Sequence, residues 1–278
     1  MFSKMKANKS VSELLGSFAD NELSPECLDG VQHVLSADGI SIPSSYTAHL
    51  TPIATPKLFT DIQSRVSTDP NAFDTPYVVL LSAIDYLSAF PENSSTTVTI
   101  NGKSQATETR MPRVLQTWEF KHPISAEVIE QSNIRRGGSA AGGGGGLGGG
   151  EGANEHNSRF WRGTFPIQNR GICHGLAGYF ETVLYASASE GAIELSTNPL
   201  TMDQKSKDMI SWFPIFFPIK QPMYLPDNSE IDVSMWRVTD DRKVWYEWMI
   251  ESWIVLGGTK VRLGQSELGT SRKGGCLM

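Results

Sequence analysis

The stretch Val244-Trp245-Tyr246-Glu247-Trp248-Met249-Ile250 consists almost entirely of aromatic, branched and other apolar residues. Such side chains suit the pleated surface of a β-strand. Similar short runs, separated by Pro, Gly, Asn and Asp, recur along the chain and indicate a β-sandwich or barrel. Within one of them, Pro214 and Pro218 predict a bulge, an edge or a break. We predict strands at 40–42, 48–53, 77–81, 114–121, 159–167, 172–186, 192–196, 212–219, 230–238 and 244–253.

One helix is predicted at residues 24–37, where apolar side chains from Leu28 to Leu35 recur at helical spacing. Ser24 is suited to cap it, and Pro25 suits its first turn. The predicted fold class is therefore mainly β: a C-terminal antiparallel β-barrel or sandwich, preceded by a short α/β portion.

A pair of glutamates, Glu13 and Glu22, is the one pattern in the sequence that suggests reaction chemistry. On a single helix their spacing would point the two side chains in opposite directions. They converge only if the segment folds back, which Gly16 permits. Two convergent carboxylates can hold a guanidinium, because its five N–H donors form a flat fork. They would also draw positive charge toward the nitrogens they contact and leave the remaining nitrogen more nucleophilic. From the spacing alone, two solvated surface acids are the alternative.

The residues around this pair closely resemble a known family. Residues 12–30 are similar to the double-glutamate loop of the type II protein arginine methyltransferases, the group of arginine methyltransferase 5. The resemblance continues, in the family's order, at Gly39–Thr47, Thr75–Val79, His174–Tyr185, Ser211–Pro222 and Lys243–Trp248. It implies an enzyme that transfers methyl groups from S-adenosylmethionine to protein arginines and forms monomethyl and symmetric dimethyl products.

The resemblance also implies roles for individual residues. Glu13 and Glu22 match the two active-site glutamates that hold the substrate guanidinium. Ser211 and Trp212 match a barrel segment that closes the arginine pocket, where the indole is suited to stack on the guanidinium. The small Ser211 would leave room near the accepting nitrogen. Without the resemblance, Trp212 would be interpreted as a buried barrel aromatic.

The resemblance begins near the end of the family's cofactor domain. About a dozen residues precede Glu13, too few for the strand, glycine turn and helix of a cofactor site. We therefore expect no cofactor-binding residue here and no S-adenosylmethionine binding by this chain alone. Residues 1–40 are predicted to be a remnant of the cofactor domain, 41–264 a β-barrel for substrate binding and oligomerisation, and 265–278 a flexible tail. Without the rest of that domain, the apolar side of the first forty residues, including Val11, Leu14, Leu15 and Phe18, is expected to lack cover.

A glycine-rich tract is predicted to form a disordered insertion at about 133–157. Gly144, Gly146 and Gly149 match a dinucleotide-binding fingerprint only because the tract is of low complexity. Arg135-Arg136-Gly137-Gly138 resembles the motifs that the family modifies, which suggests self-methylation, with a solvated linker as the alternative.

Charge and composition limit the partners. A net charge of −6 argues against a sequence-independent nucleic-acid binder and suits arginine-rich proteins, such as Arg-Gly motifs and histone tails. The histidines show no ligand spacing, so no metal is expected, and no apolar run is long enough for a membrane helix. Three cysteines predict free thiols in a reducing compartment, and we expect a cytoplasmic and nuclear location.

Two other functions remain open at this point. The first is a non-catalytic β-barrel module that binds arginine-rich proteins or a family partner. The second is an incomplete gene product. By resemblance, the complete enzyme is a homo-oligomer. The family's propeller-type partner is expected to bind an N-terminal barrel rather than this region.

Overall fold

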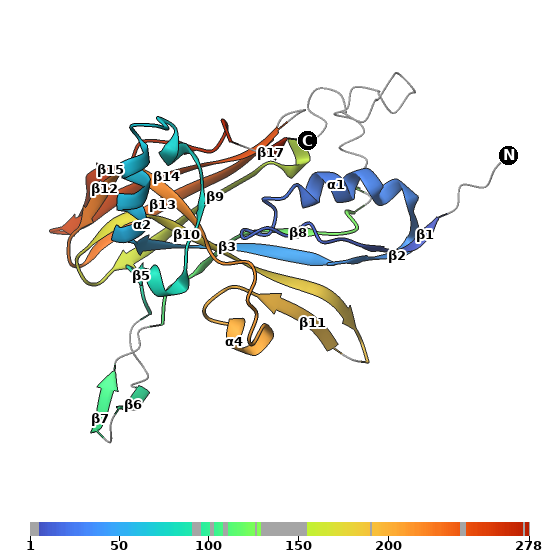
Figure 1. Ribbon diagram of the computed structural model, residues 1–278, viewed down its shortest axis with the longest axis horizontal. Coiled ribbons are helices and arrows are strands. Elements are labelled where there is room, and N and C mark those ends of the chain that lie inside the picture. Colours follow the sequence, from blue (N-terminus) through green and yellow to red (C-terminus); the bar gives the residue numbers. More distant parts are fainter. Residues whose placement is uncertain are drawn as a thin grey trace.

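Two antiparallel β-sheets form the centre of the protein, shown in Figure 1 as a computed structural model. The seven-stranded sheet has the order β4-β12-β10-β3-β5, with β11 beside β10 and β8 beside β3. The six-stranded sheet has the order β15-β14-β13-β9, with β16 and β17 beside β14. The strands of the first sheet are β3 (Ser45–Ala54), β4 (Tyr77–Val78), β5 (Asp85–Tyr86), β8 (Leu115–Lys121), β10 (Gly171–Ser187), β11 (Gly191–Ser196) and β12 (Ile215–Leu225). Those of the second are β9 (Arg159–Ile167), β13 (Ser229–Thr239), β14 (Lys243–Leu256), β15 (Thr259–Gln265), β16 (Gly269–Thr270) and β17 (Cys276–Leu277).

The structure describes residues 6–90, 96–100, 103–107, 111–125, 127–128, 155–189, 191–239, 243–274 and 276–277. Arg135, Arg136 and most of the predicted insertion lie outside these residues. The end of that predicted insertion is ordered, contrary to expectation. It forms the short 3-10 helix η5 (Glu155–Asn157), in which Asn157 is buried and its Nδ2 donates to an Asp29 carboxylate oxygen at 2.8 Å.

The main core lies between the two sheets. It contains fully buried side chains of the first sheet, such as Phe180 and Phe217, together with Val233 and Trp248 of the second. The indole of Trp248 also donates a hydrogen bond to the carbonyl oxygen of Pro218 at 2.8 Å, which joins β14 to β12. The predicted mainly β fold class is therefore confirmed.

Pro218 of β12 marks an irregularity, as the sequence predicts, whereas Pro214 lies just before that strand. The pairing of β10 with β12 shifts register between Cys173 and Gly175, and Gly175 lies opposite Pro218. Gly175 has a φ of +152°, and a Cβ there would lie 2.1 Å from the carbonyl oxygen of Phe217. Only glycine therefore allows the two strands to approach this closely.

A second apolar cluster covers the outer face of the first sheet. The helix α2 (Pro56–Arg65) packs Phe59 and Ile62 against Tyr179 and Phe216, and all four side chains are buried. The sequence did not predict this helix. The short elements η2 (Ala72–Asp74), η3 (Leu81–Ala83) and α4 (Met202–Lys205) lie in the connections. The hairpin of β6 (Thr96–Ile100) and β7 (Lys103–Thr107) projects away from both sheets (Figure 1).

The N-terminal portion is a small α/β unit. The strands β1 (Ala7–Val11) and β2 (Leu35–Ile42) pair in parallel, and the helix α1 (Ser24–Val31) lies between them in the chain. A 3-10 turn, η1 (Gln32–Val34), follows α1, so the helix predicted at 24–37 ends earlier and its last residues enter β2. In the part of the chain that the structure describes, no helix is long and apolar enough to cross a membrane.

The residues after 264 were predicted to form a loose tail, and for the described ones this is wrong. Gly269 pairs with Trp248 in β14, and a Cβ on Gly269 would lie 2.2 Å from that indole. The Ser271 side chain is buried, and its Oγ accepts a hydrogen bond from the backbone N–H of Tyr246 at 2.9 Å. The segment thus closes one edge of the second sheet.

Three buried histidines predict a pH-dependent stability. Burial lowers the pKa of His49, His122 and His174 below the ordinary value of 6.5. The unfolded chain therefore binds more protons than the folded chain as the pH falls below that value, so stability present above it is lost. From pH 7.5 to 5.5 we expect the free energy of unfolding to fall by at most about 1.4 kcal/mol for each histidine.

Urea unfolding at both pH values checks this dependence. His49→Gln should remove its share of the difference, whereas His33→Gln, at an exposed position, serves as the matched control. An equal pH dependence in the wild type and in His49→Gln would contradict the assignment.

Candidate substrate-arginine site

The loop between β1 and α1 folds back on itself, as the sequence predicts. Gly16 and Ala19 exchange two backbone hydrogen bonds, of 3.0 and 2.9 Å, and the Asn21 side-chain oxygen accepts from the Phe18 N–H at 2.7 Å. Ala19 and Leu23 adopt left-handed backbone conformations, with φ of 63° and 64°. In Figure 1 the chain leaves β1 toward the barrel and returns into α1. One predicted catalytic residue therefore lies on each limb of the loop.

Glu13 and Glu22 are both exposed at the surface. Glu13 precedes the turn at Gly16, and Glu22 follows it just before α1. Ser211 is also exposed. The roles given to these three residues remain predictions.

Trp212 connects the barrel to this loop. Its indole Nε1 donates a hydrogen bond to the carbonyl oxygen of Leu15 at 2.7 Å, between the two glutamates in the chain. The ring also packs edge-on against Phe180, with centroids 5.8 Å apart. Trp212 has a φ of 57°, which is unusual for a bulky residue and is often found at functional sites. The structure therefore brings one predicted pocket residue directly onto the double-glutamate loop.

A buried carboxylate fixes the tip of the loop to the barrel. Asp20 is only 1% exposed. One of its carboxylate oxygens accepts a hydrogen bond from Trp118 Nε1 of β8 at 2.7 Å, and the other accepts from the Tyr246 hydroxyl of β14. Arg237 Nε of β13 lies 3.6 Å from the first oxygen. Three strands of the two sheets thus converge on one side chain of the loop.

Arg237 also holds the helix that follows the loop. Its guanidinium is fully buried and donates to both carboxylate oxygens of Glu26, in the first turn of α1, at 2.8 Å each. The aromatic ring of Phe120 lies 5.3 Å from the guanidinium carbon. This two-pronged geometry is the strong form of an arginine–carboxylate pair. The loop is therefore fixed at its tip by Asp20 and at its end by Glu26.

The buried position shifts the pKa values of all three polar partners. Burial raises the pKa of the Asp20 carboxyl, while the Arg237 charge and the hydrogen bonds from Tyr246 and Trp118 act in the opposite direction. Burial and the Asp20 charge hold the pKa of Tyr246 well above its ordinary value, so the phenol remains a donor. Burial lowers the pKa of Arg237, but the Asp20 and Glu26 carboxylates outweigh it and raise that pKa. Arg237 therefore stays a cation in the core.

Sequence reasoning missed this network. One available signal was Arg237 itself, a charged residue flanked by Met235, Trp236 and Val238 in a predicted strand. Charged side chains are almost never fully buried unless they are paired. A buried Arg237 therefore predicts an acidic partner. The sequence does not show that the partners are Asp20 and Glu26.

The expected lack of apolar cover at the N-terminus is wrong for part of the loop. Leu15 and Phe18 are buried in the main core, and Phe18 is completely inaccessible to solvent. Val11, at the end of β1, is 74% exposed and agrees with the expectation. Leu14 is half-buried. The barrel therefore covers Leu15 and Phe18, while Val11 lacks cover.

The loop between β1 and α1 does not have the glycine-rich turn of a nucleotide-binding site. The loop between β1 and α1 contains a single glycine, Gly16, and a Cβ there would lie 2.3 Å from the Asn21 side chain. This glycine is required by the fold-back and leaves no open turn for a nucleotide, which such a site needs. Among the described residues, no group of His, Cys, Asp and Glu could hold a metal ion.

The fold is shared with solved arginine methyltransferases. One is a Trypanosoma brucei PRMT1 enzyme-prozyme heterotetrameric complex with AdoHcy, with a TM-score of 0.59 and 10% identity, matched over 98% of this chain and 72% of that one. Another is Arabidopsis thaliana protein arginine methyltransferase 10, with a TM-score of 0.55, 13% identity and the same two coverages. At these identities the likeness establishes the fold alone.

Family models give the narrower result. A model described as "PRMT5 oligomerisation domain" matches residues 45–276, and one described as "PRMT5 arginine-N-methyltransferase" matches residues 1–42. The chain therefore belongs to the protein arginine methyltransferase 5 family.

Curated relatives agree with this placement. Protein arginine N-methyltransferase skb1 of Schizosaccharomyces pombe is 42% identical over 260 residues, which are 93% of this chain and 34% of the relative. Protein arginine N-methyltransferase 5 of Xenopus laevis is 36% identical over 250 residues, which are 89% of this chain and 30% of the relative. The chain spans about a third of the length of these relatives.

Proposed function

We propose that this chain supplies the substrate-arginine clamp and the β-barrel of a type II protein arginine methyltransferase. The observation that carries the proposal is the Trp212 indole bonded to Leu15, within the loop that bears Glu13 and Glu22. The barrel aromatic and the two acids thereby belong to one connected unit. Its substrates are arginine-rich proteins, such as Arg-Gly segments and histone tails.

In this mechanism the two glutamates act on the guanidinium of the substrate. Each carboxylate accepts N–H donors from it, which fixes the plane of the group and draws its positive charge toward the bonded nitrogens. The nitrogen left free is then the better nucleophile. Trp212 bounds the flat face of the guanidinium, and the small Ser211 leaves space at the rim. S-adenosylmethionine supplies the methyl group when it is bound in the complete enzyme.

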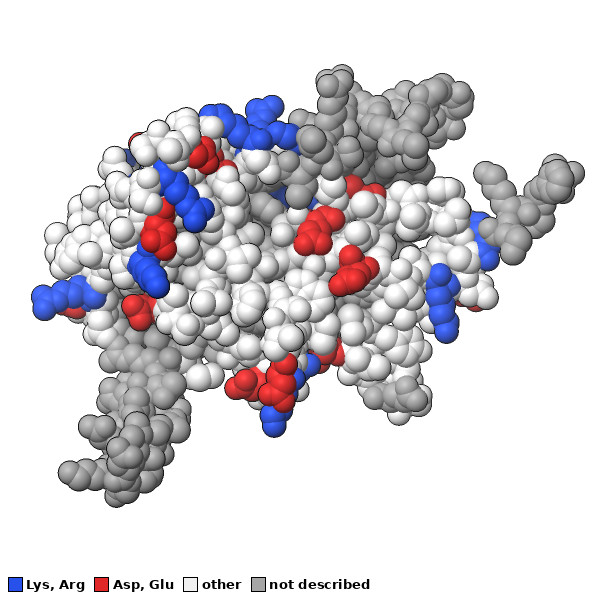
Figure 2. Space-filling model, viewed as in Figure 1, with Lys and Arg blue, Asp and Glu red and all other residues white. Residues whose placement is uncertain are grey.

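The wider setting follows from the family. We propose that the complete enzyme is a homo-oligomer that forms monomethyl and symmetric dimethyl arginine in the cytoplasm and nucleus. The face in Figure 2 shows acidic and basic side chains interspersed with one another, with wide uncharged areas around them. Such a surface is more typical of protein recognition than of sequence-independent nucleic-acid binding.

A peptide-binding experiment tests the clamp. An Arg-Gly peptide should bind this chain more tightly than the matched Lys-Gly peptide, because an ammonium lacks the flat fork that two carboxylates recognise. Glu13→Gln and Glu22→Gln should each weaken binding of the arginine peptide by about tenfold, the value of one charged hydrogen bond. Isothermal titration calorimetry and NMR titration give both affinities.

The control is Glu267→Gln, which removes a carboxylate that is 64% exposed and lies outside the loop. Its affinity for the arginine peptide should equal that of the wild type. Equal binding of the two peptides, or no loss in the Glu13→Gln, Glu22→Gln double variant, would refute the clamp. For the chain alone we expect neither S-adenosylmethionine binding nor methyl transfer. Clear turnover would contradict the expectation that this chain needs the rest of the enzyme for catalysis.

A further inference from the structure

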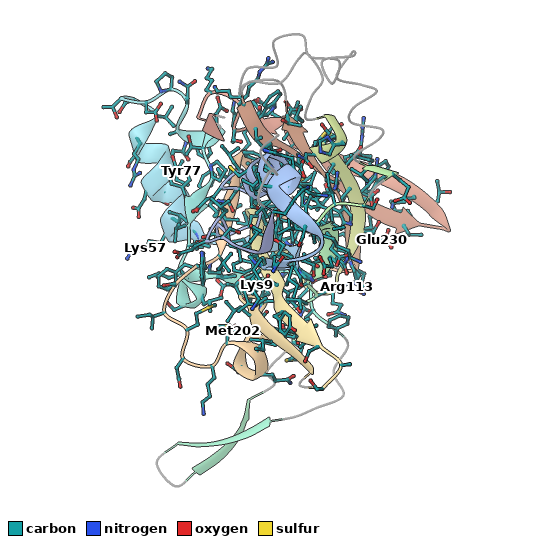
Figure 3. The ribbon with its side chains drawn as sticks, turned by 90° about the vertical axis from the view of Figure 1, so that its right-hand side faces the viewer. Lys9, Lys57, Tyr77, Arg113, Met202 and Glu230 are labelled. Carbon is teal, nitrogen blue, oxygen red and sulfur yellow. The ribbon has the colours of Figure 1, made fainter. Side chains whose placement is uncertain are left out.

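A cavity of about 90 Å³ lies beside α1, away from the double-glutamate loop. It is bounded by the strand β1, by the helix and by the turn at His122 and Pro123. Lys9, labelled in Figure 3 beside the N-terminal strands, is the charged residue among those that line it. Its apolar wall consists of Leu28, Val31, Val34 and Leu35.

Two buried polar atoms in the lining have no hydrogen-bond partner among the residues that the structure describes. Ser41 is 3% exposed, and its Oγ has no partner among the described residues. His122 is 4% exposed, and its Nδ1 likewise has none in that part of the chain. Buried polar side-chain atoms are nearly always satisfied by protein or ordered water. Two such atoms beside one cavity therefore indicate a binding position.

Neighbouring hydrogen bonds determine which nitrogen of His122 carries the proton. Ser24 Oγ donates to the Tyr46 hydroxyl oxygen at 2.7 Å, which leaves the phenol proton for His122 Nε2 at 3.1 Å. Burial lowers the pKa of His122, while Asp29 and Glu26 act in the opposite direction. A neutral imidazole that accepts at Nε2 donates at Nδ1. Both unpartnered atoms can therefore act as donors.

We propose that this cavity binds a small neutral carbonyl group on a short branched apolar skeleton, such as an acyl or carboxamide group. Its oxygen would accept from His122 Nδ1–H and Ser41 Oγ–H, since a carbonyl oxygen has two lone pairs. The skeleton would contact the apolar wall. The space is smaller than the roughly 150 Å³ cavity that admits benzene, so about four non-hydrogen atoms fit inside it. The rest of a six-atom amide would extend toward the open side, where Val31 and Val34 are each 43% exposed. Asp29 and Glu26 near His122 disfavour an anion, and the two donors with Lys9 disfavour a cation.

NMR titration of the whole 278-residue chain with isobutyramide tests the proposal. The ring nitrogens of His122 and the backbone amide of Ser41 should shift together and saturate in the millimolar range. Isobutylamine has the same carbon skeleton but carries an ammonium cation in place of the carbonyl acceptor, and it should cause no saturable shift. Equal binding of the amine, or no saturable shift with isobutyramide because the cavity holds only water, would overturn the proposal.

Three variants locate the site. Ser41→Ala should weaken isobutyramide binding about fivefold, which corresponds to one neutral hydrogen bond. Val34→Trp, at a wall position that is 43% exposed, should block the cavity without changing the buried core. Ser36→Ala is the control, because Ser36 lies on the same strand but does not line the cavity. Full affinity in Val34→Trp would show that isobutyramide binds elsewhere.

Discussion

Replacing Arg237 by methionine is expected to lower the free energy of unfolding by about 3–5 kcal/mol. The substitution leaves the carboxylates of Asp20 and Glu26 in the core without their cation, and both are almost inaccessible to solvent. An uncompensated buried charge is costly because it has lost its water and receives no compensation from the protein. Urea unfolding followed by circular dichroism and tryptophan fluorescence measures the change in midpoint.

Two further variants separate the charge effect from packing. Asp20→Asn and Glu26→Gln, added to Arg237→Met, should recover part of the loss, because no buried anion then remains. Arg262→Met is the matched control: its side chain is 53% exposed and pairs with Glu251 at 3.4 Å, so it should cost at most about 1 kcal/mol. If Arg237→Met and Arg262→Met lowered the free energy of unfolding by similar amounts, the proposed contribution of the buried network to stability would be contradicted.

Phe18→Ala should destabilise the protein by about 3–5 kcal/mol and should also release the double-glutamate loop. The Phe18 ring makes edge-on contacts with Trp118, Phe217 and Tyr246, at centroid distances of 5.7, 5.2 and 5.6 Å. Its removal therefore leaves a cavity where both sheets meet the loop. Hydrogen exchange of residues 12–23 should become faster by a larger factor than exchange in β13 and β14.

The control for this substitution is Phe160→Ala. Phe160 lies on β9, is 60% exposed and contacts Trp236 at 5.2 Å. Its loss should cost less than about 1.5 kcal/mol and leave exchange in the loop unchanged. If Phe18→Ala accelerates exchange equally in the loop and in the two strands, Phe18 stabilises the whole fold without a particular role in the loop.

Much of the sheet structure could be predicted because each strand carries its own signal. The strand predicted at 159–167 coincides with β9, and the one predicted at 172–186 lies within β10. The helix α2 was missed because its buried apolar residues are Phe59 and Ile62 alone, too few to show a helical period. Tertiary packing, rather than local pattern, stabilises such a helix.

The site was predictable to a different extent. Gly16 correctly indicated that the loop folds back, while the roles of Glu13 and Glu22 came from the family resemblance and remain predictions. The anchoring of the loop could not be derived, because Asp20 and Tyr246 are 226 residues apart in the chain. Two side chains this far apart in the sequence meet only in the folded chain. Local sequence patterns do not show which such side chains will meet.

The distance in sequence between Glu26 and Arg237 has a consequence for biosynthesis. The two residues are 211 positions apart, so the double-glutamate loop leaves the ribosome long before its anchoring strand exists. At about 5–20 residues per second, that interval is roughly 10–40 s. During this time Phe18 and Asp20 have no barrel to enter. The loop is thus made early in translation but acquires its final shape late, and a nascent chain paused before β13 would display it unanchored to chaperones.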